Sequence, residues 1–478
     1  MQILKHLITV SLLGFIISCS VNPVTGERDF VLMSEDAELE MGSNYNSQIL
    51  QFQTVYNNPK IQNYVQSIGE SLAKISHRPN LIYRFVVLDS PEVNAFALPG
   101  GYIFINRGLM VYLSSEEELA AVLAHEIGHV TARHSVKQIS QAQLLSIVSY
   151  AVASKAGSTV GDLTNIASGA LVAGYGRDME LQADSLGAEY MVKQGYSASG
   201  MINTISVLKE HEIYSKEVSQ RRGALQQTYH GIFASHPSND NRLKEIIKTA
   251  EDLKQNTNYF NSEDYLEIIE GMTYGDSEAA GVRRKDGFYH TDLDIRLISP
   301  KNWEIINTPK TLFFIPRDGE ASLQVSVSDQ VRRETPKEYL ERLVSKELYQ
   351  SKTLVLGGYQ AFSAILEEKF GRARVAVVFK DKSIFTFYGT TRQNGVDIDQ
   401  FDSQFLDIIE SFRGLNSNES KLAKPLRITS YRVKKGDTYR SLADKSSIPY
   451  DSEQRLRLLN GDYPSGNLKV GSLIKIVE

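Results

Sequence analysis

This chain contains almost no cysteine, and its positive charges do not outnumber its negative ones. The 478 residues include a single cysteine, Cys19, which excludes an intrachain disulfide. The formal net charge is -5, which gives no electrostatic reason to expect a nucleic-acid partner. The length is sufficient for two or three domains, each with a hydrophobic core of its own. We therefore expect a multidomain protein that is built without disulfides.

Long apolar runs are also scarce, and the clearest one stands at the N-terminus. A basic start precedes an apolar run over residues 7–17, which predicts a signal peptide over residues 1–18. The four residues Ile-Ile-Ser-Cys that end at Cys19 resemble a bacterial lipobox, which predicts lipid attachment at this cysteine. The alternative is an ordinary secretory signal with an unimportant cysteine. Ser20 favours, by analogy with lipoprotein sorting, the periplasmic face of the outer membrane.

A His-Glu-x-x-His sequence from His125 to His129 is the strongest functional signal in the chain. On a helix, histidines four residues apart lie on one face, one turn from each other, so both can bind a single metal ion. Glu126 stands beside them and is the candidate general base of a zinc peptidase. The five-residue pattern also occurs by chance in large proteins. The surrounding residues therefore decide how it is interpreted.

Those surroundings predict a helix that is buried on both sides. Ser114 or Ser115 is the expected N-cap, acidic residues fill the first turn, and the helix runs to about His134. An apolar stripe faces the core, and the two histidines project from the opposite side, which is expected to line a cleft. The stripe contains Leu119, Leu123, Ile127 and Val130. Because His134 continues the stripe, we expect it to be structural. Small residues, which include Ala124 and Gly128, predict close approach of a second helix.

A third metal ligand is expected about fifty residues further on, within residues 177–188. Glu180 and Asp184 are four residues apart and so share a helix face. Glu180 is the candidate ligand, and Asp184 is placed to accept a hydrogen bond from the free ring nitrogen of a ligating histidine. The alternative is a solvated acidic face with Arg177 as its partner.

Several separated segments resemble the gluzincin zinc metallopeptidases related to the CAAX prenyl endopeptidases, in particular their periplasmic bacterial members. The segments are residues 19–34, residues 94–101, the His-Glu-x-x-His helix, the helix of Glu180 and Asp184, and the stretch from residue 235 to Arg242. The resemblance spans about half of the chain. It implies one zinc ion per chain, bound by His125, His129 and Glu180, with Glu126 as the base.

One position departs from the pattern of that family. A second glutamate often stands where this chain has Gln182. On a helix wheel, Gln182 points about 160° away from Asp184. We therefore expect the change to have little effect on the metal.

Two further segments each leave alternatives open. Residues 94–98 and 102–105 flank a Pro-Gly-Gly turn, which predicts two strands. They form either a core hairpin or an edge to which an extended substrate adds as a strand. His236 lies before a helix predicted from about Asn239. It is an oxyanion donor, a fourth metal ligand in a closed state, or a capping or packing residue.

The composition changes past about residue 260. Strands are expected at residues 293–298, 311–314, 322–326, 374–379 and 383–388, and helices at residues 336–347 and 401–412. This region loosely resembles small PsbP-like or Mog1-like domains. The final fifty residues resemble a LysM module, which implies a βααβ fold and contact with glycan or protein. Residues 144–156 are apolar but too short and too polar to span a bilayer, and we expect them to form a helix near the cleft.

We expect a multidomain protein with a mainly α-helical, zincin-type metallopeptidase domain that carries a small β-sheet. It occupies residues 19–260, an α+β domain residues 261–415, and a βααβ LysM-like domain residues 425–478. The expected function is zinc-dependent hydrolysis of misfolded or misassembled envelope proteins, together with peptidoglycan or the envelope assembly machinery as a partner. The alternatives are a chaperone-like protein that rarely cuts and a peptidoglycan-associated scaffold.

Overall fold

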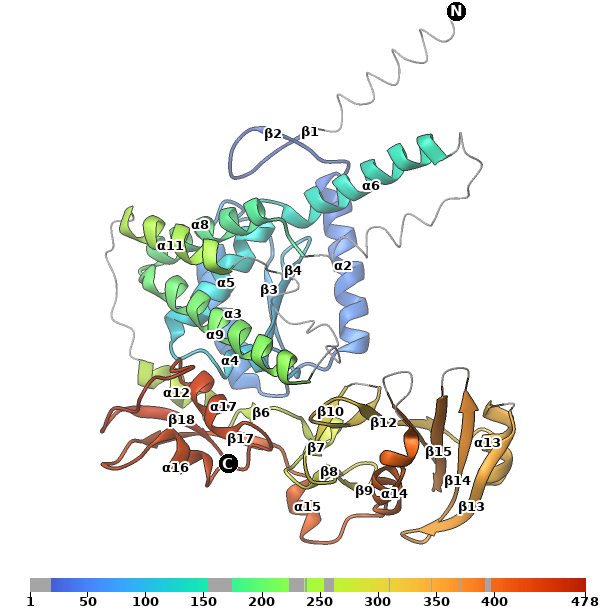
Figure 1. Ribbon diagram of the computed structural model, residues 1–478. Coiled ribbons are helices and arrows are strands. Elements are labelled where there is room, and N and C mark those ends of the chain that lie inside the picture. The colour runs from blue at the N-terminus through green and yellow to red at the C-terminus, as the bar shows by residue number, and fades with distance from the viewer. Residues whose placement is uncertain are drawn as a thin grey trace, which may run out of the picture.

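The computed structural model describes most of the chain and shows three regions (Figure 1). The described residues are 19–153, 174–222, 236, 239–252, 262–308, 310–344, 346–368, 371–391 and 397–478. The predicted signal peptide therefore lies outside them. Cys19 begins strand β1 (Cys19–Val21), which pairs with β2 (Arg28–Phe30). Among the described residues, no helix combines the length and the apolar content that crossing a bilayer requires.

The first region is a cluster of helices around a three-stranded sheet with the order β3-β5-β4. The strands are β3 (Arg84–Leu88), β4 (Ala95–Leu98) and β5 (Tyr102–Asn106). The helices are α2 (Glu35–Phe52), α3 (Pro59–Ala73), α4 (Arg107–Met110), α5 (Glu116–Thr131), α6 (His134–Ala153), α8 (Arg177–Gln194), α9 (Ser199–Arg222) and α11 (Asn239–Asp252). The predicted strand-turn-strand is confirmed as β4 and β5. Gly100 and Gly101 adopt positive φ angles of 78° and 88° in the turn between them.

Alternation along the strands divides the side chains of this sheet between two apolar layers. Leu88, Leu98 and Phe104 point toward Tyr45 and Ile49 of α2. The residues between them point to the opposite face and join the large core formed with α3 and α5. Helix α5 therefore packs on one face of the sheet, and α2 covers the opposite face (Figure 1).

Helix α5 begins where the sequence predicts and ends earlier than expected. The Ser115 side chain caps it by accepting a hydrogen bond from the Glu118 amide, and glutamates fill its first turn. The helix stops at Thr131, because Arg133 adopts a left-handed conformation with φ of 57°. The expected continuation to His134 is wrong, since this histidine starts α6 instead.

Two glycines allow α5 and α8 to pack in close contact. A Cβ atom on Gly128 would lie 2.9 Å from the Ala183 carbonyl oxygen, and one on Gly187 would lie 3.1 Å from the His125 amide nitrogen. The predicted close approach of a second helix is therefore confirmed. It brings the residues of α8 within side-chain reach of both histidines.

The second region contains a seven-stranded antiparallel sheet with the order β10-β11-β12-β16-β15-β14-β13. Its strands are β10 (Trp303–Asn307), β11 (Leu312–Pro316), β12 (Ala321–Asp329), β13 (Leu348–Leu356), β14 (Tyr359–Glu368), β15 (Gly371–Lys380) and β16 (Ser383–Thr391). A smaller sheet joins β7 (Val282–Arg283), β8 (Gly287–His290) and β9 (Ile295–Ile298). The helices are α13 (Pro336–Val344) and α14 (Asp402–Glu410). The expected strands and helices are present, whereas β7, β8, β10, β13 and β14 were not predicted.

The C-terminal region has the order β17 (Leu426–Arg432), α16 (Tyr439–Ala443), α17 (Ser452–Leu459) and β18 (Leu473–Val477). Its sheet gains a third strand, β6 (Thr273–Tyr274), which follows α12 (Ser262–Ile269). The apolar side chains of this region are continuous with the core around α5. Lys475 also donates a hydrogen bond of 2.7 Å to the Leu113 carbonyl, just before α5 begins. The C-terminal region is therefore docked on the helical region (Figure 1).

Candidate metal centre

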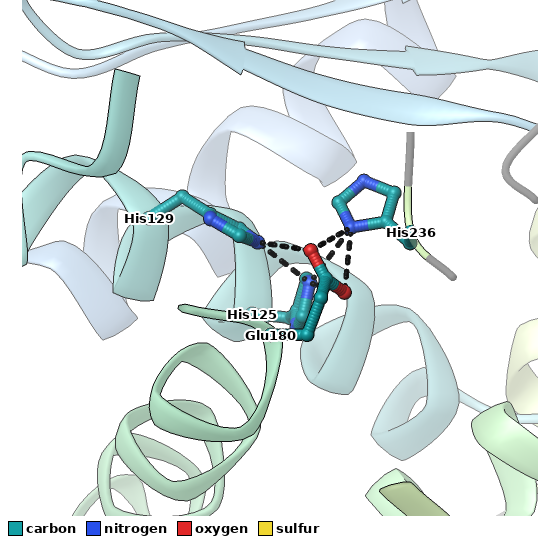
Figure 2. A group of neighbouring side chains, drawn as sticks. All are labelled: His125, His129, Glu180 and His236. Atoms are coloured by element: carbon teal, nitrogen blue, oxygen red, sulfur yellow. Dashed lines mark hydrogen bonds and ion pairs between the residues drawn. The ribbon is translucent and has the colours of Figure 1, made fainter. Parts of the chain in front are cut away.

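Four buried side chains from three parts of the chain converge on one point (Figure 2). His125 and His129 come from α5, Glu180 comes from α8, and His236 precedes α11. One ligand atom from each of the four lies within 4.8 Å of the others. The sequence predicted the first three as metal ligands, and the structure brings them together with His236.

The arrangement of donor atoms fits a metal ion better than a network of hydrogen bonds. His129 Nε2 lies 3.0 Å from His125 Nε2, and His125 Nε2 lies 3.2 Å from His236 Nδ1. His236 Nδ1 lies 2.9 and 3.0 Å from the two Glu180 carboxylate oxygens. A neutral imidazole has one N–H and one lone pair, so two ring nitrogens that face each other compete for few protons. A cation shared by all four groups removes that conflict, and imidazole with carboxylate is a zinc donor set.

Glu180 is charged and held in place by its neighbours. It is fully buried and lies 3.4 Å from His129 Nε2 and 3.6 Å from His125 Nε2. Burial opposes the charged carboxylate, but His236 and His129 hold the pKa of Glu180 well below its usual range. Since the side chain has no solvent contact, the alternative of a solvated acidic face is excluded for this part of α8.

Asp184 links the metal centre to a residue to which the sequence gave no role. His125 Nδ1 lies 2.8 Å from Asp184 Oδ1, which leaves His125 Nε2 facing the cluster. Arg242 of α11 donates two hydrogen bonds of 2.7 Å to the same carboxylate. Burial opposes the charge of Asp184, but Arg242 lowers its pKa to about 2. Only the position of Arg242 just after His236 in the chain could have indicated this contact.

Glu126 is placed to act on protons at the centre. Its side chain is almost completely buried, and burial raises the pKa of its carboxyl group. The carboxylate lies 3.5 Å from His236 Nε2 through Oε1. A cavity of about 20 Å³ is lined by His125, Glu126 and His236, among others, and is large enough for one water molecule. A carboxylate with a raised pKa beside such a cavity is suited to general base chemistry.

His134 does not continue the apolar stripe of α5, as the helix pattern predicted, although it lies outside the four-residue cluster. Because the chain turns at Arg133, the His134 ring lies against His129, with their Nδ1 atoms 2.9 Å apart. Burial lowers the pKa of His134 to about 4, so its ring is neutral. Tyr175 completes these surroundings by stacking on His129 at a centroid distance of 4.0 Å. No periodic feature of the sequence indicated this aromatic contact.

Strand β4 lies next to the metal helix, and no described strand pairs with its outer edge. The backbone groups of that edge could align an extended peptide, as the sequence allowed. The inner edge pairs with β5, and Ala95 and Ala97 join the core. Strand β4 can therefore contribute to the core and still offer its outer edge to a peptide. Helix α6 continues the chain after His134 to Ala153, and the rest of the helix expected near the cleft lies outside the described residues.

Two domains of this chain match known families. Residues 59–250 match peptidase family M48, and residues 431–477 match the LysM domain. The beta-barrel assembly-enhancing protease of Yersinia pestis is 26% identical over 255 residues, which cover 51% of this chain and 50% of that protein. The mitochondrial metalloendopeptidase OMA1 of Schizosaccharomyces pombe is 29% identical over 216 residues, which cover 45% of this chain and 59% of that protein. The chain thus spans about half the length of the curated relatives it matches.

A solved structure of PsbP from the cyanobacterium Synechocystis is 13% identical and covers 30% of this chain and 98% of its own, with a TM-score of 0.23. A score at that level carries no argument, so the PsbP-like or Mog1-like character of the second region stays a prediction. The resemblance to zinc metallopeptidases and to LysM modules is confirmed by the family matches. Zinc as the cofactor is confirmed by the peptidase family together with the buried cluster. The role of each individual site residue stays a prediction.

Proposed function

We propose that this chain, whose residues 59–250 form a peptidase family M48 domain and whose residues 431–477 form a LysM domain, is a zinc-dependent metalloendopeptidase. The observation that carries the proposal is the buried convergence of His125, His129 and Glu180, with Glu126 beside them. Metal content measured together with cleavage of an unfolded protein tests it.

The three ligands and the base have separate tasks in the proposed reaction. His125, His129 and Glu180 would hold the zinc ion, which when bound polarises a peptide carbonyl and lowers the pKa of a water molecule. Glu126 accepts a proton from the attacking water and returns it to the leaving amine, so the carboxylate is regenerated in each cycle. Burial favours this shuttle, because it raises the pKa of Glu126 toward the working pH.

His236 has the position of a fourth ligand that closes the centre. Its Nδ1 atom lies in the same 4.8 Å group as the three ligands, and its Nε2 atom faces Glu126 at 3.5 Å. A catalytic zinc site needs one open position for water or substrate. We therefore propose that His236 occupies that position in a resting state and withdraws when substrate binds.

The substrates that we propose are unfolded or misassembled proteins of the bacterial envelope. The outer edge of β4, with which no described strand pairs, supports this class, because backbone pairing aligns an extended chain without reading its sequence. The name of the Yersinia pestis relative places that protein in the assembly of β-barrels. For this chain we propose the envelope assembly machinery and peptidoglycan as partners, the latter through the LysM domain.

We further propose that the protein is lipid-anchored at the periplasmic face of the outer membrane through Cys19, the only cysteine. Cys19→Ser is expected to convert a protein that fractionates with membranes into one that is soluble or retains its signal, because the serine hydroxyl cannot carry the lipids. Metabolic labelling with a fatty acid, followed by membrane fractionation, measures this. Label that persists on the Cys19→Ser protein would reject the anchor.

Asp184 is expected to contribute to activity by raising the affinity of the centre for zinc. Asp184→Ala should weaken zinc binding by about 10- to 100-fold, with activity returning at high zinc, since His125 loses the carboxylate that orients it. The same change leaves Arg242 without its main partner and should lower the free energy of unfolding by about 3–5 kcal/mol. Zinc titration on protein shown to be folded separates the two effects, and Asp184→Asn is the milder variant. Unchanged zinc affinity would assign Asp184 a packing role only.

A further inference from the structure

His129 is held from behind by two residues that lie outside the ligand set. Its Nδ1 atom faces His134 Nδ1 at 2.9 Å, and His134 Nε2 faces the Gln182 side-chain oxygen at 2.9 Å. His134 is fully buried at the start of α6, whereas Gln182 belongs to α8. The turn at Arg133 makes this contact possible, because it carries His134 back toward His129. The three side chains form one continuous line of hydrogen bonds that ends at the metal centre.

The positions of the protons in this line follow from the need to bind a metal. His129 presents Nε2 to the cluster, 3.0 Å from His125 Nε2, so the proton of its neutral ring must be on Nδ1. That N–H donates to His134 Nδ1, which requires the proton of His134 to be on Nε2. Gln182 accepts this second proton through its amide oxygen. With the Gln182 amide reversed, its NH₂ group would donate instead, both rings would change tautomer, and His129 Nε2 would carry a proton and lose its lone pair.

The two ligating histidines are therefore supported differently. His125 faces a carboxylate, Asp184, which is itself bound by Arg242. His129 faces the neutral ring of His134, which in turn faces the neutral side-chain amide of Gln182. Outer partners of metal-binding histidines set the tautomer and the basicity of the ring. Because a side-chain carboxylate accepts the same hydrogen bond as the Gln182 oxygen and adds a negative charge, glutamate at this position would keep the line intact.

We propose that His134 and Gln182 are positioning residues that fix the tautomer of His129 and thereby set the zinc affinity of the centre. This inference deepens the proposed zinc site and rests on it. The expectation that Gln182 has little influence on the metal assumed that its face of α8 is remote from the centre. That face is instead occupied by His134, which transmits the effect of Gln182 to His129.

The test compares zinc affinity in four variants of the full chain by competition with a chelating indicator. His134→Phe should weaken zinc binding by about 10- to 100-fold, and Gln182→Leu by about 10-fold. Gln182→Glu should bind zinc at least as tightly as the wild type, because the acceptor oxygen is retained. His211→Leu is the matched control, since His211 is a buried histidine that packs on Tyr112 and lies outside the four-residue cluster. Its zinc affinity should match that of the wild type.

A double variant distinguishes one line of hydrogen bonds from two independent packing effects, and Gln182→Glu tests the line without removing a buried side chain. Gln182→Leu added to His134→Phe should cause no further loss of affinity, since Gln182 acts only through His134. The proposal would be overturned if the two losses of zinc affinity were additive, or if both single variants bound zinc with wild-type affinity. An equal loss in Gln182→Glu and Gln182→Leu would also overturn it. A wild-type chain that binds no zinc would instead reject the proposed function, which is a separate result.

Discussion

Glu126→Gln is expected to reduce peptide hydrolysis by about 10²- to 10⁴-fold and to leave zinc bound. The amide has nearly the shape of the carboxylate but cannot accept a proton, and Glu126 is not one of the four clustered residues that can hold the ion. Turnover of an unfolded protein and zinc content, measured on the same preparation, give both results. Glu117→Gln is the matched control, because Glu117 lies in the first turn of α5, away from the cluster.

Activity of Glu126→Gln within a few fold of the wild type would contradict the mechanism. Loss of zinc in this variant would contradict the division between ligands and base. If the variant lacks hydrolysis but restores a cellular function as well as the wild type, the chaperone-like alternative is favoured instead. Such a result would show that holding a client in the cleft, rather than cutting it, matters to the cell.

His236→Ala is expected to raise proteolysis and to leave zinc bound. If His236 closes the site in most molecules, an open state populated at about 10% or less limits turnover, so the substitution should raise the rate by about 10-fold or more. The reason is geometric, since Nδ1 of His236 already lies with the ligand atoms of His125, His129 and Glu180. Initial rates at several substrate concentrations, with zinc content on the same samples, measure the effect. His290→Ala, in strand β8 of the second region, is the control.

The other two roles for His236 predict different outcomes. An oxyanion donor would be revealed by a loss of roughly 100- to 1,000-fold in turnover with zinc retained. A packing residue would be revealed by unchanged turnover. Either result would contradict the closing role.

Those parts of the site that depend on helical periodicity could be predicted from the sequence. His125 and His129 are four residues apart on one helix, and Glu180 and Asp184 repeat that spacing on another, so each pair shares a face by geometry alone. Small residues at the contact, such as Gly128, indicated that the two helices approach each other. The candidate ligands and the close contact between their two helices could therefore both be predicted from the sequence.

Contacts that depend on a change of chain direction could not be predicted in this way. The helix pattern placed His134 on the apolar stripe, because nothing in the sequence marks the left-handed turn at Arg133, where a glycine would be the usual signal. Arg242 reaches Asp184 from a third helix, a contact that no spacing within α8 reveals.

Strand β13 was missed for a different reason. Most of its side chains are exposed, which removes the apolar alternation that marks a strand.

Zinc content measured together with cleavage of an unfolded protein, with and without a chelator, tests the metallopeptidase proposal most directly. The expected result is one zinc ion per chain and cleavage that stops when the chelator removes the ion and returns when zinc is added. Cleavage that continues at the same rate in the zinc-free protein would contradict the proposal. So would a zinc-loaded wild-type protein that binds unfolded chains and leaves them intact, with His236→Ala equally inactive.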